Sequence, residues 1–153
     1  MIRTGELNNS TLVARPLSRF RWVTCASPAY LREYGIPQSP DELLQHRAIH
    51  YFSGSARRTG ELRFARGAET LSVPVNGDAP VNETGLYIKM CLEGFGLAQL
   101  AGRIVSEHLQ EGRLIEVLAD WQPPPVPVTL LYPHQRFLSP AVRTFADWIA
   151  DII

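Results

Sequence analysis

The stretch Asn82–Leu100, with the sequence NETGLYIKMCLEGFGLAQL, predicts a helix, a glycine turn and a strand in immediate succession. Four apolar side chains recur at the spacing of one helical face, and these are Leu86, Tyr87, Met90 and Cys91. Asn82 can cap the first turn, and Gly94 follows the predicted end of the helix at Glu93. The apolar run Phe95–Leu100 then predicts a short strand. A helix followed directly by a strand is typical of α/β proteins.

The same alternation continues on both sides of this stretch. Serine–proline pairs predict the starts of further helices at Ser27-Pro28, Ser39-Pro40 and Ser139-Pro140. Runs of β-branched and aromatic residues predict strands at Leu12–Arg15, Phe20–Ala26, Ala48–Phe52, Leu114–Leu118 and Val128–Tyr132, and a hairpin of Leu62–Ala65 and Thr70–Val75. Ser39 and Glu42 have the spacing of a capping box. Strands that alternate with helices predict an α/β sheet with helices on its faces.

The composition is that of an ordinary globular protein. The 153 residues are 45% hydrophobic and 20% charged, with 15 Lys and Arg against 15 Asp and Glu. This balance argues against a dedicated nucleic-acid surface, which needs a basic excess. No apolar run is long enough to cross a membrane, and the first residues do not read as a signal peptide. Cys25 and Cys91 stand in apolar runs without metal-type spacing, so we expect two reduced core thiols and a cytoplasmic protein.

Three stretches, taken together and in order, carry a family resemblance. Ala14–Leu17 with Arg21–Leu31 predicts a strand that leads into a helix, and Ile88–Leu100 holds a helix, a Gly-x-Gly-Leu-Ala turn and a strand. Val128–Pro133 with Leu138–Trp148 predicts a strand and a last helix. In this register the three resemble the effector-binding regulatory domain of LysR-type bacterial transcription regulators. In that family they correspond to the strand crossing between lobes, the helix and turn of the second lobe, and the returning strand with its closing helix.

The resemblance implies a periplasmic-binding-protein type 2-like α/β fold, a mixed sheet flanked by helices, with the second lobe complete and the first partial. Residues 1–19 are then a remnant of the first lobe, 20–127 the second lobe, and 128–153 the return strand and closing helix toward the first lobe. Family members begin with a winged helix-turn-helix, which is absent here, so Met1 is interpreted as an artificial or misplaced start. Ala101 stands where most members have proline.

Ligands of open α/β sheets bind beyond the carboxyl ends of strands, and LysR effectors bind in the cleft between the lobes. These arguments predict the effector-binding residues Ala26, Ser27, Phe52, Ser53, Asn82, Glu83, Leu100 and Ala101. Ser27 and Asn82 each precede a helix, whose free N–H groups can hold an anion, but simple capping is an equal alternative. Glu83 would oppose an anion, and its alternative role is to complement the helix end. Phe52 can line the pocket or pack in the core.

Other motifs predict less chemistry. Arg57 and Arg58, on a polar loop, could meet an acidic effector or form a solvated surface. His46 and His50 have a helical ligand spacing, but His50 falls in a predicted strand without a third ligand, so no metal is expected. The sequence has no P-loop, no Gly-x-Ser-x-Gly elbow and no HExxH motif, so we expect neither an enzyme nor a cofactor.

The leading hypothesis is a regulatory domain that senses a small molecule, an anion being one option, and controls a DNA-binding transcription factor. DNA is contacted only through the absent winged helix-turn-helix, and a membrane is not a partner. The alternatives are a solute-binding protein of a transporter, or an enzyme on the same fold with Cys25 as a reactive thiol near the cleft. The last helix has an apolar stripe that should be under-covered, which favours self-association. Its residues are Val142, Phe145, Trp148 and Ile149.

Overall fold

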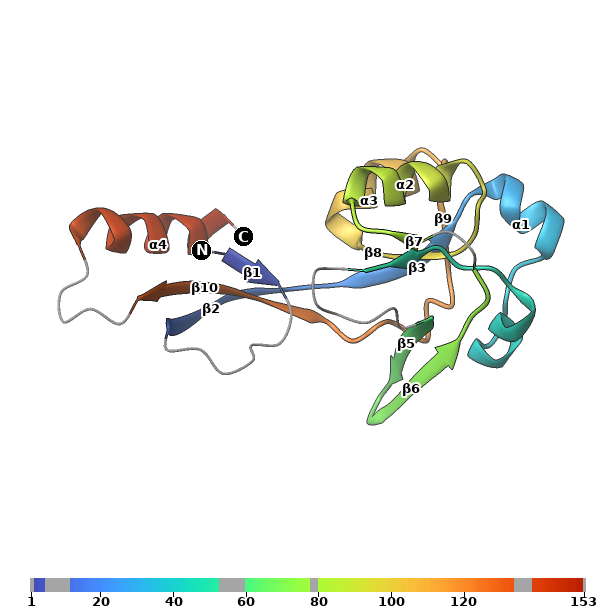
Figure 1. Ribbon diagram of the computed structural model, residues 1–153, viewed down its shortest axis with the longest axis horizontal. Coiled ribbons are helices and arrows are strands. Elements are labelled where there is room, and N and C mark those ends of the chain that lie inside the picture. The colour runs from blue at the N-terminus through green and yellow to red at the C-terminus, as the bar shows by residue number, and fades with distance from the viewer. Residues whose placement is uncertain (1, 5–11, 53–59, 78–79, 134–138, 153) are drawn as a thin grey trace. The chain divides into compact units, whose positions relative to one another are not determined.

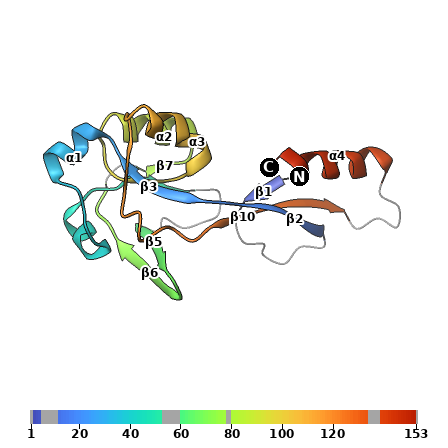
Figure 2. The ribbon, with the colours of Figure 1, turned by 180° about the vertical axis from the view of Figure 1, so that it is seen from behind.

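The computed structural model describes residues 2–4, 12–52, 60–77, 80–133 and 139–152, which belong to two compact units (Figure 1, Figure 2). The smaller unit combines Met1–Phe20 with Pro125–Ile153, and the larger unit is Arg21–Pro124. These limits lie close to the expected boundaries after residues 19 and 127. Within the described residues, no helix is long and apolar enough to cross a membrane.

A three-stranded antiparallel sheet forms the smaller unit, in the order β1 (Ile2–Thr4), β10 (Val126–Pro133) and β2 (Leu12–Phe20). The bounds expected for two strands, Leu12–Arg15 and Phe20–Ala26, are wrong, because β2 runs through Pro16 to Phe20 and β3 begins only at Trp22. Pro16 lies on an edge strand, and the pairing register shifts opposite it, between Val128 and Thr129. Proline lacks the N–H that a ladder uses, and an edge or a bulge is where a sheet tolerates it.

Helix α4 (Pro140–Ile152) completes the smaller unit and begins at the predicted serine cap, where Ser139 Oγ accepts from Val142 N at 3.4 Å. Ala146 is buried, and Arg15 on β2 donates to Asp147 at 2.7 Å. The predicted exposure of the apolar stripe is confirmed for three side chains: Val142 at 38%, Phe145 at 46% and Trp148 at 57%. Ile149 is half-buried.

The larger unit is built on an antiparallel sheet in the order β8 (Ala98–Ala101), β3 (Trp22–Ala26) and β9 (Ile115–Val117). Helices α2 (Thr84–Leu92) and α3 (Gly102–Gln110) lie on one side of this sheet, and the hairpin β5 (Glu61–Arg66) and β6 (Glu69–Pro74) lies on the other (Figure 1). Strand β4 (His50–Tyr51) pairs in parallel with β7 (Pro80–Val81). The predicted hairpin is confirmed, whereas β4 covers only His50–Tyr51 of the strand expected at Ala48–Phe52.

The two remaining helices show one correct cap and one wrong one. Helix α1 (Pro28–Tyr34) begins as predicted, with Ser27 Oγ accepting from Tyr30 N at 3.3 Å. The next segment, η1 (Pro40–Gln45), is a 3₁₀ helix, and the Ser39 side chain makes no capping bond. The Glu42 carboxylate accepts from Gln38 N at 2.9 Å, one residue before the cap, so the predicted capping box does not form.

Buried side chains gather in two clusters. The first packs α1, η1 and the hairpin together and includes Tyr30, Leu43, Phe64, Leu97 and Val117. The second lies under α2 and α3 and includes Val23, Cys25, Tyr87, Cys91 and Val105. Both cysteines are 0% exposed, as expected of core thiols, and the Cys91 thiol donates to the Cys25 carbonyl at 3.6 Å. The adjacent Cys25 side chain and burial raise the pKa of Cys91, which disfavours the reactive thiolate.

Tyr30 and His46 form a buried polar contact between α1 and the end of η1. The Tyr30 hydroxyl accepts from Arg47 N at 2.9 Å. Its own proton can go to His46 Nδ1 at 3.0 Å or to the Arg47 carbonyl at 3.3 Å. His46 is 5% exposed, so its ring is best accommodated uncharged.

This contact predicts that stability falls in acid. Burial lowers the pKa of His46 from its ordinary 6.5, although Glu42 acts in the opposite direction. The unfolded chain therefore takes up the proton first, and stability present above the unfolded-state pKa is lost as the pH falls through the folded-state pKa. Urea unfolding at about pH 7.5 and about pH 5.5 measures this loss, which His46→Gln should reduce because glutamine does not titrate. The same pH dependence in His46→Gln would contradict the assignment.

Candidate functional site

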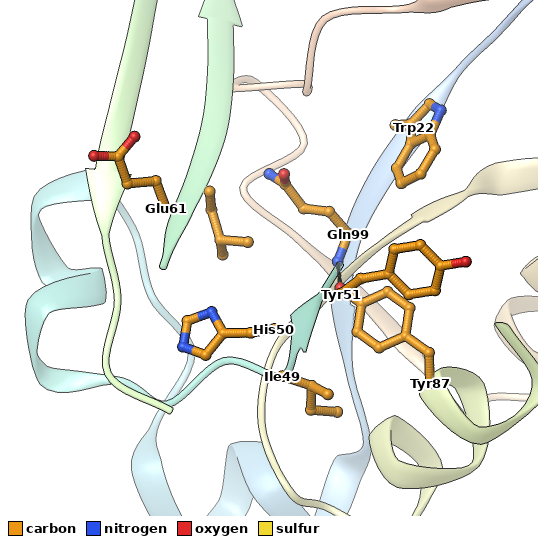
Figure 3. Close-up of a pocket in the computed structure, with 8 residues that line it drawn as sticks. Trp22, Ile49, His50, Tyr51, Glu61, Tyr87 and Gln99 are labelled. Atoms are coloured by element: carbon orange, nitrogen blue, oxygen red, sulfur yellow. Dashed lines mark hydrogen bonds between the residues drawn. The ribbon is translucent and has the colours of Figure 1, made fainter. Parts of the chain in front are cut away.

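The larger unit contains a cavity of about 170 Å³ between β4, the hairpin and the sheet (Figure 3). Its lining comes from several elements and consists of Trp22, Ile49, His50, Tyr51, Glu61, Leu62, Tyr87 and Gln99. Aromatic faces and a few polar groups on a concave surface are the usual makeup of a small-molecule site. This cavity is therefore the candidate functional site.

Two tyrosines form the aromatic side of the pocket, and Figure 3 shows them across from Glu61. The rings of Tyr51 and Tyr87 lie 5.3 Å apart at 38°. Tyr87 is 4% exposed, and burial raises its pKa, so it stays a neutral phenol. Its hydroxyl accepts from Gln99 N at 2.9 Å. Tyr51 lines the cavity and is 40% exposed, and its hydroxyl lies 3.5 Å from Thr84 Oγ1.

Among the residues that the structure describes, some polar groups of the pocket are hydrogen-bonded within the protein and others are not. The Gln99 amide is fully occupied by Arg63 and Thr24. Within the described part of the chain, neither the His50 ring nor the Glu61 carboxylate has a hydrogen-bond partner. The lining contains no Lys or Arg. A solute in this pocket would therefore meet an imidazole, a carboxylate and the tyrosine rings.

Four of the predicted effector residues are buried and lie at opposite ends of one strand pair. Ala26 is 0%, Ser27 2%, Leu100 2% and Ala101 4% exposed. Trp22 pairs with Ala101 and Cys25 with Ala98, so the ends of β3 and β8 point in opposite directions. The strand-end argument places ligands at one edge only when the strands run parallel. The structure therefore does not bring Ser27 and Ala101 together.

The predicted cap of α2 is wrong by one residue. Glu83, not Asn82, caps this helix, and its carboxylate accepts from Gly85 N at 2.7 Å and Leu86 N at 2.6 Å. These bonds lower the pKa of Glu83. The N–H groups that could have received an anion already hold this carboxylate. In the structure Glu83 therefore has its alternative role, in which the carboxylate complements the positive end of the helix.

The remaining predicted residues lie beside the pocket or outside the described chain. Phe52 is half-buried, and its N–H donates to the Val81 carbonyl at 2.9 Å. Ser53 lies outside the described residues, as do Arg57 and Arg58. The pocket is lined instead by the residues directly before Phe52 and Leu100. Side chains alternate along a strand, so a search for the open face instead of the strand end would have selected them.

A family model described as the LysR substrate binding domain matches residues 1–152. The HTH-type transcriptional regulator YhjC of Escherichia coli strain K12 is 37% identical over 155 aligned positions, which cover 100% of this chain and 51% of that protein. The chain thus spans about half the length of the curated relatives it matches.

Solved structures of the regulators CrgA and AphB share the fold at more than a quarter sequence identity. CrgA, a LysR-type transcriptional regulator from Neisseria meningitidis, has a TM-score of 0.80 at 27% identity, covering 99% of this chain and 51% of that one. AphB, the Vibrio cholerae virulence activator, has a TM-score of 0.80 at 26% identity, covering 98% and 50%. These matches confirm the predicted periplasmic-binding-protein type 2-like α/β class. The chain belongs to the LysR substrate-binding domain family.

Proposed function

We propose that this chain is the effector-sensing part of a bacterial transcription regulator, and that the pocket of the larger unit is one wall of its effector site. The observation that carries the proposal is the aromatic and polar lining around Tyr51 and Tyr87, in a chain of a substrate-binding family. Residues 20–127 correspond to the second lobe in this proposal, and the flanking segments return to the first. The solute-binding and enzyme alternatives receive no support from the relatives above, which are named transcriptional regulators.

The lining of the pocket suits some chemical groups of an effector better than others. Glu61 and His50 suit hydroxyl, amide or amine groups, and the tyrosine rings suit a flat or apolar body. An anionic group, which the sequence argument left as an option, finds no Lys or Arg in this lining. Phe52 and Leu100, first predicted as effector-binding residues, directly follow the lining residues Tyr51 and Gln99 in the chain and do not line the pocket themselves. Asn82 is exposed and remains a candidate for contact with an effector, whereas the Glu83 carboxylate is already bound to Gly85 N and Leu86 N.

DNA binding by the rest of the protein and self-association of this chain are parts of the same proposal. The relatives carry HTH in their names, and the half of their length that this chain does not match would supply the DNA-binding part. Effector binding controls that part by favouring one of two arrangements, which requires different affinities for the two. The exposed apolar stripe of α4 favours self-association. Because a bacterial transcription regulator acts on DNA in the cytoplasm, we expect the protein there.

A metabolite screen by thermal unfolding tests the proposal. An effector present at about 100 times its dissociation constant adds about 2.7 kcal/mol of stability. We expect a hit on the unchanged chain to lose its effect with Tyr51→Ala, which removes an aromatic wall of the pocket. Tyr34→Ala is the matched control, because Tyr34 is 41% exposed against 40% for Tyr51 and stacks on Tyr30 instead of lining the cavity.

The two variants separate pocket binding from general stabilisation. A compound that stabilises the unchanged chain and Tyr34→Ala, but not Tyr51→Ala, supports the proposed site. A compound that stabilises all three equally binds elsewhere and would overturn the assignment of this pocket.

A further inference from the structure

Gln99 makes an unusual set of contacts for a pocket residue. Its side-chain amide donates to the Arg63 carbonyl at 2.8 Å and to Thr24 Oγ1 at 3.2 Å, and its amide oxygen accepts from Arg63 N at 3.3 Å. Its backbone N–H donates to the Tyr87 hydroxyl at 2.9 Å. One residue thus links the hairpin, strand β3 and helix α2.

The side-chain amide takes the place of a neighbouring strand. Along the edge of β5 that faces away from β6, Arg63 is paired by the Gln99 amide and Ala65 by the Gln122 carbonyl at 2.8 Å. No backbone ladder joins β5 to β8 in the described part of the chain. An amide offers one donor side and one acceptor side, as a peptide does, and so can satisfy both backbone groups of Arg63.

Gln99 joins two walls of the pocket, one on the hairpin and one on α2. Glu61 and Leu62 reach the cavity from the hairpin, next to Arg63. Tyr87 reaches it from α2 and holds the backbone of Gln99. The spacing between the hairpin wall and the tyrosine wall is therefore set through Gln99.

We propose that Gln99 is the positioning residue of the pocket. The purpose of this role rests on the proposed effector function, whereas the test of the role needs no effector. Its own amide is committed to the protein and is not an effector contact. Recognition belongs to the unengaged groups of His50 and Glu61 and to the Tyr51 ring, and Gln99 holds the hairpin strand that carries Glu61 at a fixed distance from Tyr87.

Two substitutions of Gln99 in the 153-residue chain test this role by NMR, without any effector. Gln99→Met keeps the length of the side chain and removes both bonding partners of Arg63. We expect its Arg63 amide to lose about tenfold of its protection from hydrogen exchange. When ionised, Gln99→Glu loses the donor to the Arg63 carbonyl and sets a carboxylate oxygen against that carbonyl oxygen. We expect the repulsion between the two oxygens to displace the side chain, and with it the acceptor of the Arg63 N–H. When protonated, a carboxyl group offers a donor and an acceptor again.

The expected signature is a pH profile that a merely structural residue would not produce. In Gln99→Glu, protection of the Arg63 amide and the methyl shifts of Leu62 should return toward those of the unchanged chain as the introduced carboxyl group is protonated. The methyl shifts of Val105, buried on α3, should stay constant. The unchanged chain at each pH removes the contribution of His46, and Gln110→Met, at an exposed position on α3, is the matched control.

Full protection of Arg63 in Gln99→Met would overturn the proposal. A Gln99→Glu profile that runs parallel to that of the unchanged chain would also overturn it, because protonation would then restore nothing. Since no effector is added, either result leaves effector binding untouched. A failed metabolite screen equally leaves this result standing.

Discussion

Replacing Phe64 with alanine is expected to lower the free energy of unfolding of the larger unit by about 3–5 kcal/mol. Phe64 is 0% exposed and belongs to the cluster that joins the hairpin to α1 and η1. Its alternation along β5 places Leu62 and Phe64 inward and Arg63 outward, so the benzyl group holds the hairpin against the core. Removing it leaves a cavity that the surrounding strands can close only in part. Urea unfolding followed by circular dichroism measures the change.

Phe95→Ala is the control for this prediction. Phe95 is 58% exposed, although it stands in the turn before β8, so its removal should change stability by less than about 0.5 kcal/mol. Because the hairpin carries Glu61 and Leu62 of the pocket, Phe64→Ala should also abolish stabilisation by any screening hit, whereas Phe95→Ala should not. Equal losses of stability in the two variants would contradict the importance given to Phe64.

The elements that could be predicted from the sequence are those that local chemistry decides. The hairpin followed from the alternation of apolar residues on both sides of Gly67, whose φ of 61° suits glycine in a turn. The start of α1 followed from Ser27 and Pro28, which cap a helix wherever it packs. The continuation of β2 through Pro16 could not be predicted, because the bulge that accommodates this proline depends on the partner strand β10. Such a bulge is a property of two paired strands and is invisible in one of them.

The candidate site could be predicted only to its neighbourhood. The sequence indicates where strands end, but it does not reveal that β3 and β8 are antiparallel, and this direction separates Ala26 from Ala101. Tyr51 and Gln99 each stand one position before a predicted residue, on the other face of the strand. Which face is open depends on the hairpin, which the chain reaches later than Tyr51. The cap of α2 shows the same limit, because Asn82 and Glu83 are both able caps and only the folded backbone selects one.

The Gly-x-Gly turn that supported the family resemblance has a physical reason in the fold. Gly94 has a φ of 83° at the end of α2, which ends the helix in the left-handed region. Gly96 lies against the backbone of the segment before β4, where Leu97 N donates to the Arg47 carbonyl at 2.8 Å and Ile49 N to the Leu97 carbonyl at 2.9 Å. Ala48 and Leu97 form a parallel bridge there. This crossing positions the segment that carries three pocket residues, Ile49, His50 and Tyr51.

Gly96→Ala is therefore expected to damage both stability and the pocket. A Cβ at Gly96 would lie 2.8 Å from the Arg47 carbonyl oxygen, and the φ of 156° is one that L side chains rarely adopt. Strain of about 1–3 kcal/mol and overpacking of a similar size give an expected loss of about 3 kcal/mol. Gly67→Ala is the control, because its φ of 61° is also unfavourable but nothing lies within 4 Å of the added atom. It should cost about 1–2 kcal/mol and leave the pocket intact.

The two glycine variants separate backbone strain from close approach. The obstacle to a Cβ at Gly96 is a backbone carbonyl, which has no rotamer to move into, so the Arg47–Ala48 segment itself must shift. That shift would move Ile49, His50 and Tyr51 relative to Tyr87, and Gly96→Ala should therefore lose the response to a screening hit at temperatures where it is still folded. Gly67→Ala, at the tip of the hairpin, should keep the response despite its strained turn. If Gly67→Ala were as destabilised as Gly96→Ala, strain alone would account for both, and the close approach at Gly96 would have no separate effect.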